Sequence, residues 1–338
     1  MLRPRYRPDW TPSWLENLYL GPKRCEDYSS LQDADYEPGC IDATHIESGR
    51  LVSVKRVLTS SQELAILEHL SQTCLLVDPN NHCARIWDCF QDEDPQWTFI
   101  VIPFLCATTS LSGFDIVNDV IQIMDDALEG LVFTHAQGIA HRRISRHTLR
   151  TDESPMHPGG FHPVVHMQTP DFNGWATVLS RSTATSRVRH YYTGFGDAVR
   201  CESGAPELFK ADVAALGLLL ASFSRSYERT EFLASLVQDM VRGRPTAAEA
   251  LEQWRTIRAR ISWVGRMRRL TIPENGNSWL KTVLLDVCCI LSLLYMCLPA
   301  PVRWVGDALC KHFFLCVIYV TMGSVSVLIM DYIYRLVI

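Results

Sequence analysis

The order of apolar and polar positions in the first hundred residues predicts a strand, a helix and two further strands. Residues 51–55 alternate between apolar and polar side chains, which is typical of a half-buried strand. Residues 60–71 begin with two serines that can cap a helix, and leucines then recur at helical spacing. Two later runs, 84–90 and 97–103, have the length and composition of strands.

The middle of the chain changes to a helical pattern. Apolar side chains recur every three to four positions across residues 117–137, and Gly138 follows as a residue that favours a helix end. A stretch rich in proline, glycine and histidine covers residues 153–189, and Tyr191 and Tyr192 then form a strand-like pair. Helical patterns return at 211–223, 231–242 and 246–260. A strand-rich first part is therefore expected to precede a helix-rich second part.

Charge almost vanishes from two segments near the C-terminus. Residues 282–300 contain a single charged side chain, Asp286, and residues 312–330 contain none. About 20 apolar residues cross the hydrocarbon of a bilayer as a helix, so a transmembrane helical hairpin in a lipid bilayer is expected. Arginines precede it at 255, 258, 260, 266, 268 and 269, which favours the cytosolic side for both ends. The alternative is a pair of buried helices in a soluble domain.

Composition argues against nucleic-acid binding, a cysteine-based zinc or redox motif, and a secretory signal. The 338 residues are 47% hydrophobic and 20% charged with a formal net charge of −5, so no nucleic-acid partner is expected. The twelve cysteines include no CxxC pair, which indicates reduced cytosolic thiols rather than a zinc site or a redox motif. The first ten residues have no apolar stretch, so no secretory signal is expected there.

Three histidines lie close together in the segment HPGGFHPVVH. His157, His162 and His166 lack cysteine or acidic partners at a helical or hairpin spacing, which zinc ligands commonly show. We therefore interpret them as ordinary loop histidines and expect no metal site.

Eight segments carry a more specific signal through their order along the chain. They are VSVKRV, QELAIL, PNNHCARIWDCF, FIVIPFL, HAQGIAHRRISRHTLRTD, YYTGFGDAV, GAPELFKADVAALGLLL and GRPTAAEAL. Over roughly residues 41–265, this series resembles the protein kinase superfamily, and in particular a divergent fungal group of kinase-like proteins. The most specific segment is the fifth, which is similar to the catalytic loop HRDxxxxN.

The resemblance implies an α+β, bilobal protein-kinase-like fold with a small β-rich N-lobe and a larger helical C-lobe. The implied units are an irregular N-terminal arm at 1–40, an N-lobe at 41–105, a C-lobe at 106–270 with an insertion at 153–190, and a membrane segment at 279–338 with helices at about 282–300 and 312–330.

Two retained residues correspond to the phosphate-binding part of a kinase. Lys55 matches the lysine that holds the α- and β-phosphates, and Glu63 matches the glutamate that orients it. Residues 37–49 contain scattered glycines and no GxGxxG loop. The resemblance therefore implies ATP, held without Mg²⁺, as the only candidate cofactor.

Three positions have lost the chemistry of phosphoryl transfer. Arg143 stands at the position of the catalytic base, and a guanidinium cannot accept a proton from the substrate hydroxyl. Thr148 stands at the second metal position, where its hydroxyl could still bind Mg²⁺. Gly194 replaces the aspartate of DFG and supplies no carboxylate for metal.

Residues with a structural role in kinases are retained. His141 and Phe195 match the positions that stack in the internal hydrophobic spine, and Asp212 matches the residue that anchors the catalytic-loop backbone. Glu207 and Arg244 match a pair that joins the APE motif to a later helix.

We therefore expect a multi-pass membrane protein whose kinase-like domain faces the cytosol. The leading interpretation is a catalytically inactive pseudokinase that regulates or binds a protein of unknown identity. The alternative is a weakly active atypical kinase that binds ATP and phosphorylates serine or threonine, with Asp152, Asp197 or Asp212 replacing a lost acid.

Overall fold

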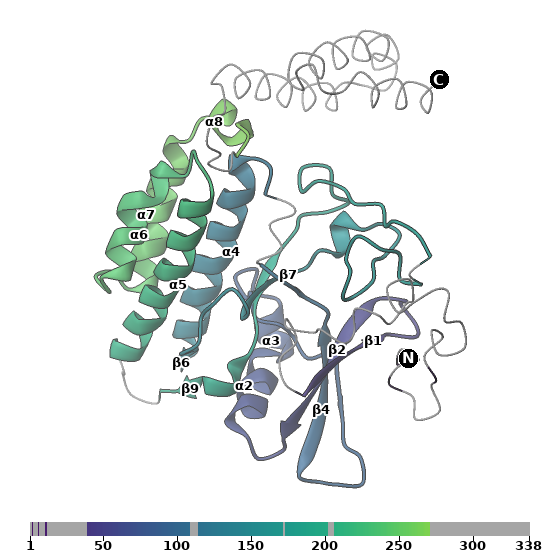
Figure 1. Cartoon of the computed structure of the whole chain (residues 1–338). Coiled ribbons are helices and arrows are strands. Elements are labelled where there is room, and N and C mark those ends of the chain that lie inside the picture. Colours follow the sequence, from purple (N-terminus) through teal and green to yellow (C-terminus); the bar gives the residue numbers. More distant parts are fainter. Residues whose placement is uncertain are drawn as a thin grey trace, which may run out of the picture.

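The computed structural model describes a small β-rich region packed against a larger helical region (Figure 1). The described residues are Leu2, Tyr6, Thr11, 39–108, 114–171, 173–201 and 206–270. Most of the predicted N-terminal arm, and both predicted membrane segments, therefore lie outside the described part.

A four-stranded antiparallel sheet forms the small region, with the order β1-β2-β4-β3. Its strands are β1 Cys40–Thr44, β2 Leu51–Leu58, β3 Asp88–Phe90 and β4 Trp97–Pro103. Two short helices, α2 Gln62–Leu70 and α3 Thr73–Leu76, connect β2 to β3. The predicted helix is confirmed, because Oγ of Ser61 caps α2 by accepting a hydrogen bond from the Leu64 amide at 3.3 Å.

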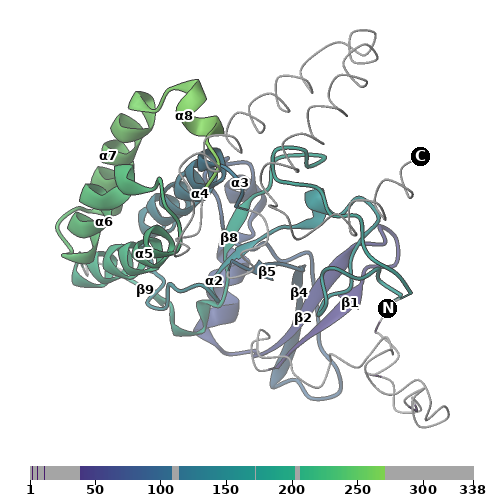
Figure 2. The ribbon, with the colours of Figure 1, turned by 45° about the horizontal axis from the view of Figure 1, so that its top comes forward.

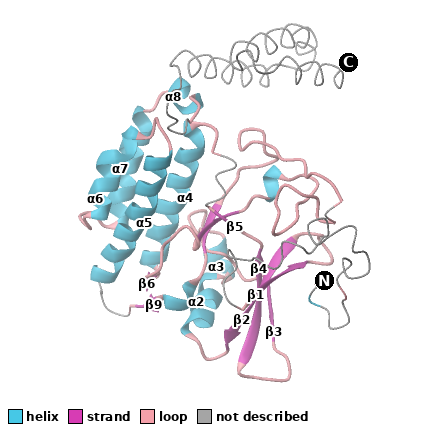
Figure 3. Ribbon diagram, in the orientation of Figure 1, coloured by secondary structure: helices cyan, strands magenta, loops and turns pink. Residues whose placement is uncertain are grey.

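The larger region contains four long helices and two small sheets (Figure 3). Its helices are α4 Val117–Ala136, α5 Pro206–Ser226, α6 Ala234–Val241, α7 Ala247–Arg260 and the short α8 Trp263–Met267, with a 3-10 turn, η6 Glu231–Leu233, before α6. One small sheet has the order β5-β7-β8 and the other pairs β6 with β9. Their strands are β5 Cys106–Ala107, β6 Ile139–Ala140, β7 Leu149–Thr151, β8 His190–Tyr192 and β9 Val199–Arg200.

Two more 3-10 turns, η4 Ser154–Met156 and η5 Phe195–Asp197, lie near these sheets. Residues between β7 and β8 form the long teal run of loops in Figure 2, apart from η4. This segment corresponds to the predicted insertion.

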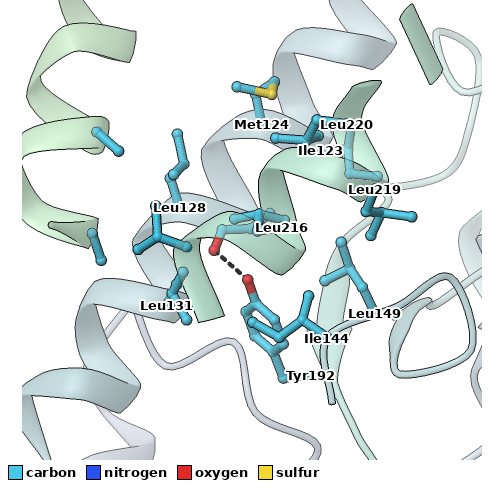
Figure 4. Packing of buried hydrophobic residues seen from close by; sticks show 14 of the residues in the cluster. Ile123, Met124, Leu128, Leu131, Ile144, Leu149, Tyr192, Leu216, Leu219 and Leu220 are labelled. Atoms are coloured by element: carbon cyan, nitrogen blue, oxygen red, sulfur yellow. Dashed lines mark hydrogen bonds between the residues drawn. The ribbon is translucent and has the colours of Figure 1, made fainter. Parts of the chain in front are cut away.

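The core of the helical region lies between α4 and the helices and strands around it (Figure 4). Met124 and Leu128 on α4 and Leu216 on α5 are each fully buried. The hydroxyl of Tyr192, on β8, donates a hydrogen bond of 2.7 Å to the Ala127 carbonyl on α4. Burial of large apolar side chains is the main stabilising contribution here, and each adds about 1.5–3 kcal/mol.

Local patterns predicted several element bounds well. The strand at 97–103 matches β4, and the long helix ends at Ala136 before Gly138, which adopts φ 70°. Thr246 caps α7 through its Oγ1, so the last predicted helix is also confirmed.

One strand prediction was wrong at its start, and one strand was missed. The run 84–90 is a strand only from Asp88, because the Ala84 amide instead donates a hydrogen bond to the Tyr192 carbonyl at 2.9 Å. Strand β1 was not predicted, since buried Asp42 interrupts its apolar pattern. The hydroxyl of Tyr6 donates a 2.7 Å hydrogen bond to this carboxylate.

Among the helices of the described residues, none combines the length and the apolar character needed to span a bilayer.

Candidate functional site

A lysine and a glutamate meet where the four-stranded sheet packs against α2. Nζ of Lys55, on β2, lies 2.6 Å from Oε1 of Glu63, in the first turn of α2. Only 12% of each side chain is exposed. The antiparallel pairing of Lys55 with Ile100 on β4 fixes its place in the sheet, and the Ser61 cap fixes the start of the helix. The structure therefore brings together the two residues that the resemblance assigns to the phosphates.

Asp212 on α5 holds the loop that follows α4. Its Oδ2 accepts a hydrogen bond from the His141 amide and its Oδ1 accepts one from the Arg142 amide, each at 2.7 Å. Arg142 has φ 64°, a left-handed conformation that is rare for residues other than glycine. The buried carboxylate supports this conformation by binding two successive amides. Asp212 thus anchors the loop that carries Arg143.

A buried contact links this loop to the segment after β8. The rings of His141 and Phe195 lie 4.8 Å apart between centroids, and both side chains are fully buried. Nε2 of His141 donates a hydrogen bond to the Thr193 carbonyl at 2.9 Å. Leu67 of α2 belongs to the same buried core. Packing therefore couples α2, the loop and the turn η5.

Arg143 points away from this core. Its side chain is 70% exposed, and its Nη1 lies 3.4 Å from Oδ2 of Asp197, which is 55% exposed. A solvent-exposed pair of this kind contributes little to stability. At the position that the resemblance assigns to a catalytic base, the structure thus places a guanidinium beside a carboxylate.

Thr148 uses its hydroxyl inside the loop. Oγ1 donates a 2.6 Å hydrogen bond to the Arg143 carbonyl and accepts one of 2.9 Å from the Ser145 amide. The residue is 2% exposed. Its hydroxyl thus closes the turn of the loop, and metal binding would have to replace these contacts.

Gly194 adopts φ 70° and ψ 50° immediately before η5. A left-handed conformation costs other residues roughly 1–2 kcal/mol, although aspartate and asparagine tolerate it better than most. The position therefore provides the required turn without a carboxylate. Gly196 follows, and a Cβ atom added there would lie 3.5 Å from Oε2 of Glu63.

Several of these contacts join residues that the resemblance to protein kinases places together. No protein-family model matches the chain, and no curated protein matches its sequence. Among solved structures, it is similar to the Rad53 kinase domain and SCD2 in complex with AMPPNP, with 19% identity, 64% of this chain and 87% of that chain covered, and a TM-score of 0.39. It is also similar to the Rad53 kinase domain and SCD2 alone, with 16% identity, coverage of 64% and 83%, and a TM-score of 0.41. Similarities at this level of identity and TM-score carry no argument about the function of this chain.

The structure contradicts the expected pair between Glu207 and Arg244. Glu207 lies in the first turn of α5 with 84% of its side chain exposed, and it is 3.7 Å from Lys210. Arg244 instead contacts Asp239 at 2.8 Å. Each charge finds a partner close in sequence, so among the described residues these two do not form the expected link.

The position of Asp197 beside Arg143 was not predicted from the sequence. Its spacing from Gly194 gave no reason to expect it beside the catalytic loop, yet the turn η5 brings its carboxylate to Arg143. The only signal in the sequence was its position within the GFGD segment.

Proposed function

We propose that this chain is a catalytically inactive kinase-like module that regulates or binds another protein. The observation that carries the proposal is the contact between Arg143 and Asp197, together with the missing carboxylate at Gly194. Phosphoryl transfer depends on metal ions that bridge the phosphates and on an acid that positions the hydroxyl. Here the position assigned to the base holds the cation Arg143, and this cation contacts the carboxylate of Asp197.

The retained scaffold supports a selected function for the fold. Asp212 still binds the amides of His141 and Arg142, and His141 still packs on Phe195. These contacts stabilise the shape of a kinase lobe and do not themselves transfer phosphate. A protein that keeps the shape and loses the chemistry is suited to present a surface to a partner.

A second candidate is a weakly active kinase that binds ATP. The buried contact between Lys55 and Glu63 favours it, because an ammonium held in one place can bind nucleotide phosphates. A kinase of this kind would need another acid to hold Mg²⁺, whereas in the inactive module, without the carboxylate of DFG, any binding of ATP would depend little on Mg²⁺.

Thermal unfolding of the full chain with ATP, with and without Mg²⁺, separates the two candidates. A bound ligand raises stability by RT ln(1 + [L]/Kd). The inactive module predicts no release or transfer of γ-phosphate, and any stabilisation by ATP should be the same in both conditions. Stabilisation that requires Mg²⁺, accompanied by phosphate transfer that Lys55→Ala abolishes, would establish the kinase instead. Lys210→Ala is the matched control, since Lys210 is a partly exposed lysine on α5.

The membrane assignment belongs to the same proposal. Residues 279–338 would anchor the module through two helices, 282–300 and 312–330, with the kinase-like lobes on the cytosolic side. The arginines that precede these segments support that orientation.

A further inference from the structure

Four side chains from separate parts of the chain converge beside β5. Cys106 lies on β5, Glu153 lies two residues after the end of β7, and His157 and His166 belong to the insertion. Ligand atoms of Cys106, Glu153 and His166 all lie within 4.8 Å of one another. Nε2 of His157 lies 3.9 Å from Oε2 of Glu153. A thiol, a carboxylate and one imidazole are thus directed at one small volume, and the imidazole of His157 lies beside it.

The hydrogen bonding of His166 shows which of its nitrogens faces the cluster. Nε2 contacts the Pro163 carbonyl at 3.2 Å, and because a carbonyl only accepts, Nε2 carries the proton. Nδ1 lies 3.4 Å from Oε2 of Glu153. In a neutral ring, Nδ1 would present a lone pair to a carboxylate, which is unfavourable without a cation between them. A backbone carbonyl that holds the far nitrogen of a histidine is a common arrangement in metal sites.

His157 lies at the edge of the cluster. Its residue is 5% exposed, and its buried Nδ1 has no hydrogen-bond partner. Its Nε2 is the nitrogen that faces Glu153, and it is too far away for a hydrogen bond. A metal bound by Nε2 would still leave Nδ1 without a partner, so His157 is not counted among the ligands.

The distances suit tetrahedral zinc. With Zn–N and Zn–O bonds of about 2.1 Å, two ligand atoms of a tetrahedron lie roughly 3.4 Å apart. The separation between Glu153 and His166 is 3.4 Å, and the ligand atoms of Cys106, Glu153 and His166 all lie within 4.8 Å of one another. His162 is different, because its Nδ1 accepts hydrogen bonds from the amides of Val164 and Val165.

We propose that Cys106, Glu153 and His166 form a Zn²⁺ site, with water as the fourth ligand. The thiol of Cys106 would lose its proton to solvent on binding, and its thiolate would form the Zn–S bond. One thiolate and one carboxylate balance the charge of Zn²⁺, while the imidazole and the water add none, which favours a buried complex. The proposal does not depend on the proposed function.

The site would attach the insertion to β5, the strand that follows the connection between the four-stranded sheet and the helical region. Phe161 packs between both imidazoles, with ring centroids 4.4 Å from His157 and 5.2 Å from His166. It also contacts Phe104, two residues before Cys106, at 6.0 Å. Zinc would therefore hold a long loop segment in place against β5.

Metal analysis of the tag-free full chain, purified in detergent, tests the site. We expect one Zn²⁺ per chain, and its loss from Cys106→Ser and His166→Gln. Cys83→Ser and His147→Gln are the matched controls and should keep the metal, since Cys83 is a buried cysteine and His147 a partly exposed histidine outside the cluster.

Cobalt substitution provides a readout that does not depend on the variants. Chelator-treated wild-type chain, titrated with Co²⁺, should give a thiolate-to-cobalt charge-transfer band in the near ultraviolet and the visible bands of tetrahedral Co²⁺. Absence of the thiolate band from the wild type would overturn the proposal. So would a wild-type zinc content in either ligand variant.

Discussion

The guanidinium of Arg143 lies 3.4 Å from the carboxylate of Asp197, on the exposed side of a loop whose backbone is bound by buried Asp212. The loop is therefore shaped from inside the helical region, while its outward chemistry is that of an ion pair. Rigid scaffolds commonly carry variable chemistry on their loops in this way.

Restoring the missing carboxylate should restore binding of a metal–nucleotide complex. Gly194→Asp places an acid before η5, in a left-handed conformation that aspartate tolerates. We expect the affinity for Mg·ATP to rise at least about tenfold, equivalent to about 1.4 kcal/mol, as measured by calorimetric titration. Gly194→Asn has the same shape without the charge and is the control. Equal affinities of the two variants would show that the position no longer faces a metal site.

Asp212→Asn should weaken the fold. The asparagine would turn an amide NH₂ toward one of the two backbone amides that the carboxylate now binds, leaving a buried donor unsatisfied. We expect a loss of about 2–4 kcal/mol in the free energy of unfolding, measured with urea. Asp197→Asn alters an exposed aspartate of the same site and should leave the midpoint unchanged. A small loss in Asp212→Asn would mean that the loop does not depend on this anchor.

Gly217→Ala should destabilise the protein, although alanine normally favours a helix. A Cβ atom at this position of α5 would lie 2.8 Å from Cβ of Met240 and 2.9 Å from the amide nitrogen of Val241. Separating α5 from α6 should cost about 1–3 kcal/mol, seen as a lower unfolding temperature. Gly159→Ala is the control, because nothing lies within 4 Å of its added Cβ. An unfolding temperature unchanged by Gly217→Ala would contradict the close packing.

Acid should destabilise the fold through His190. Burial lowers the pKa of this histidine from 6.5 to about 4, while Nδ1 donates a hydrogen bond to Asp126 at 2.9 Å. Below pH 6.5 the unfolded chain takes up a proton that the folded chain excludes until about pH 4, so stability falls across that window. The loss approaches about 1.4 kcal/mol per pH unit.

Urea unfolding at several pH values measures this slope. His190→Gln should flatten the slope between pH 6.5 and 4, whereas His147→Gln, at a partly exposed position, should not. Identical slopes in wild type and His190→Gln would assign the acid sensitivity to other groups.

Removal of residues 279–338 should release the kinase-like region from membranes. The deleted segment contains both apolar stretches, and a transmembrane helix anchors a protein almost irreversibly. Fractionation should move the shortened chain from the membrane pellet to the soluble fraction. A matched deletion of the first ten residues should leave the full-length distribution unchanged. Continued sedimentation of the shortened chain with membranes, after a salt wash, would locate the tether elsewhere.

Local spacing in the sequence was sufficient for the elements that depend on neighbours along the chain. The helix at 117–137, the strand at 97–103 and the cap at Ser61 were predicted because periodicity and capping act within a few residues. The contact between Lys55 and Glu63 was expected only from the resemblance to protein kinases.

Tertiary structure alone decided the contacts between distant loops. The sequence separates Cys106 from Glu153 by 47 positions, so no local spacing could show that the pairing of β5 with β7 brings them together. The same limit applies to the contact between Arg143 and Asp197. It also applies to Glu207 and Arg244, because each of these two contacts a residue closer in the sequence. Charged side chains on loops and helix ends have several accessible partners, and only the folded backbone selects among them. By itself, the sequence determined the order of segments that resembles a kinase and the identities of Arg143 and Gly194, whereas only the folded backbone decided which side chains lie beside them.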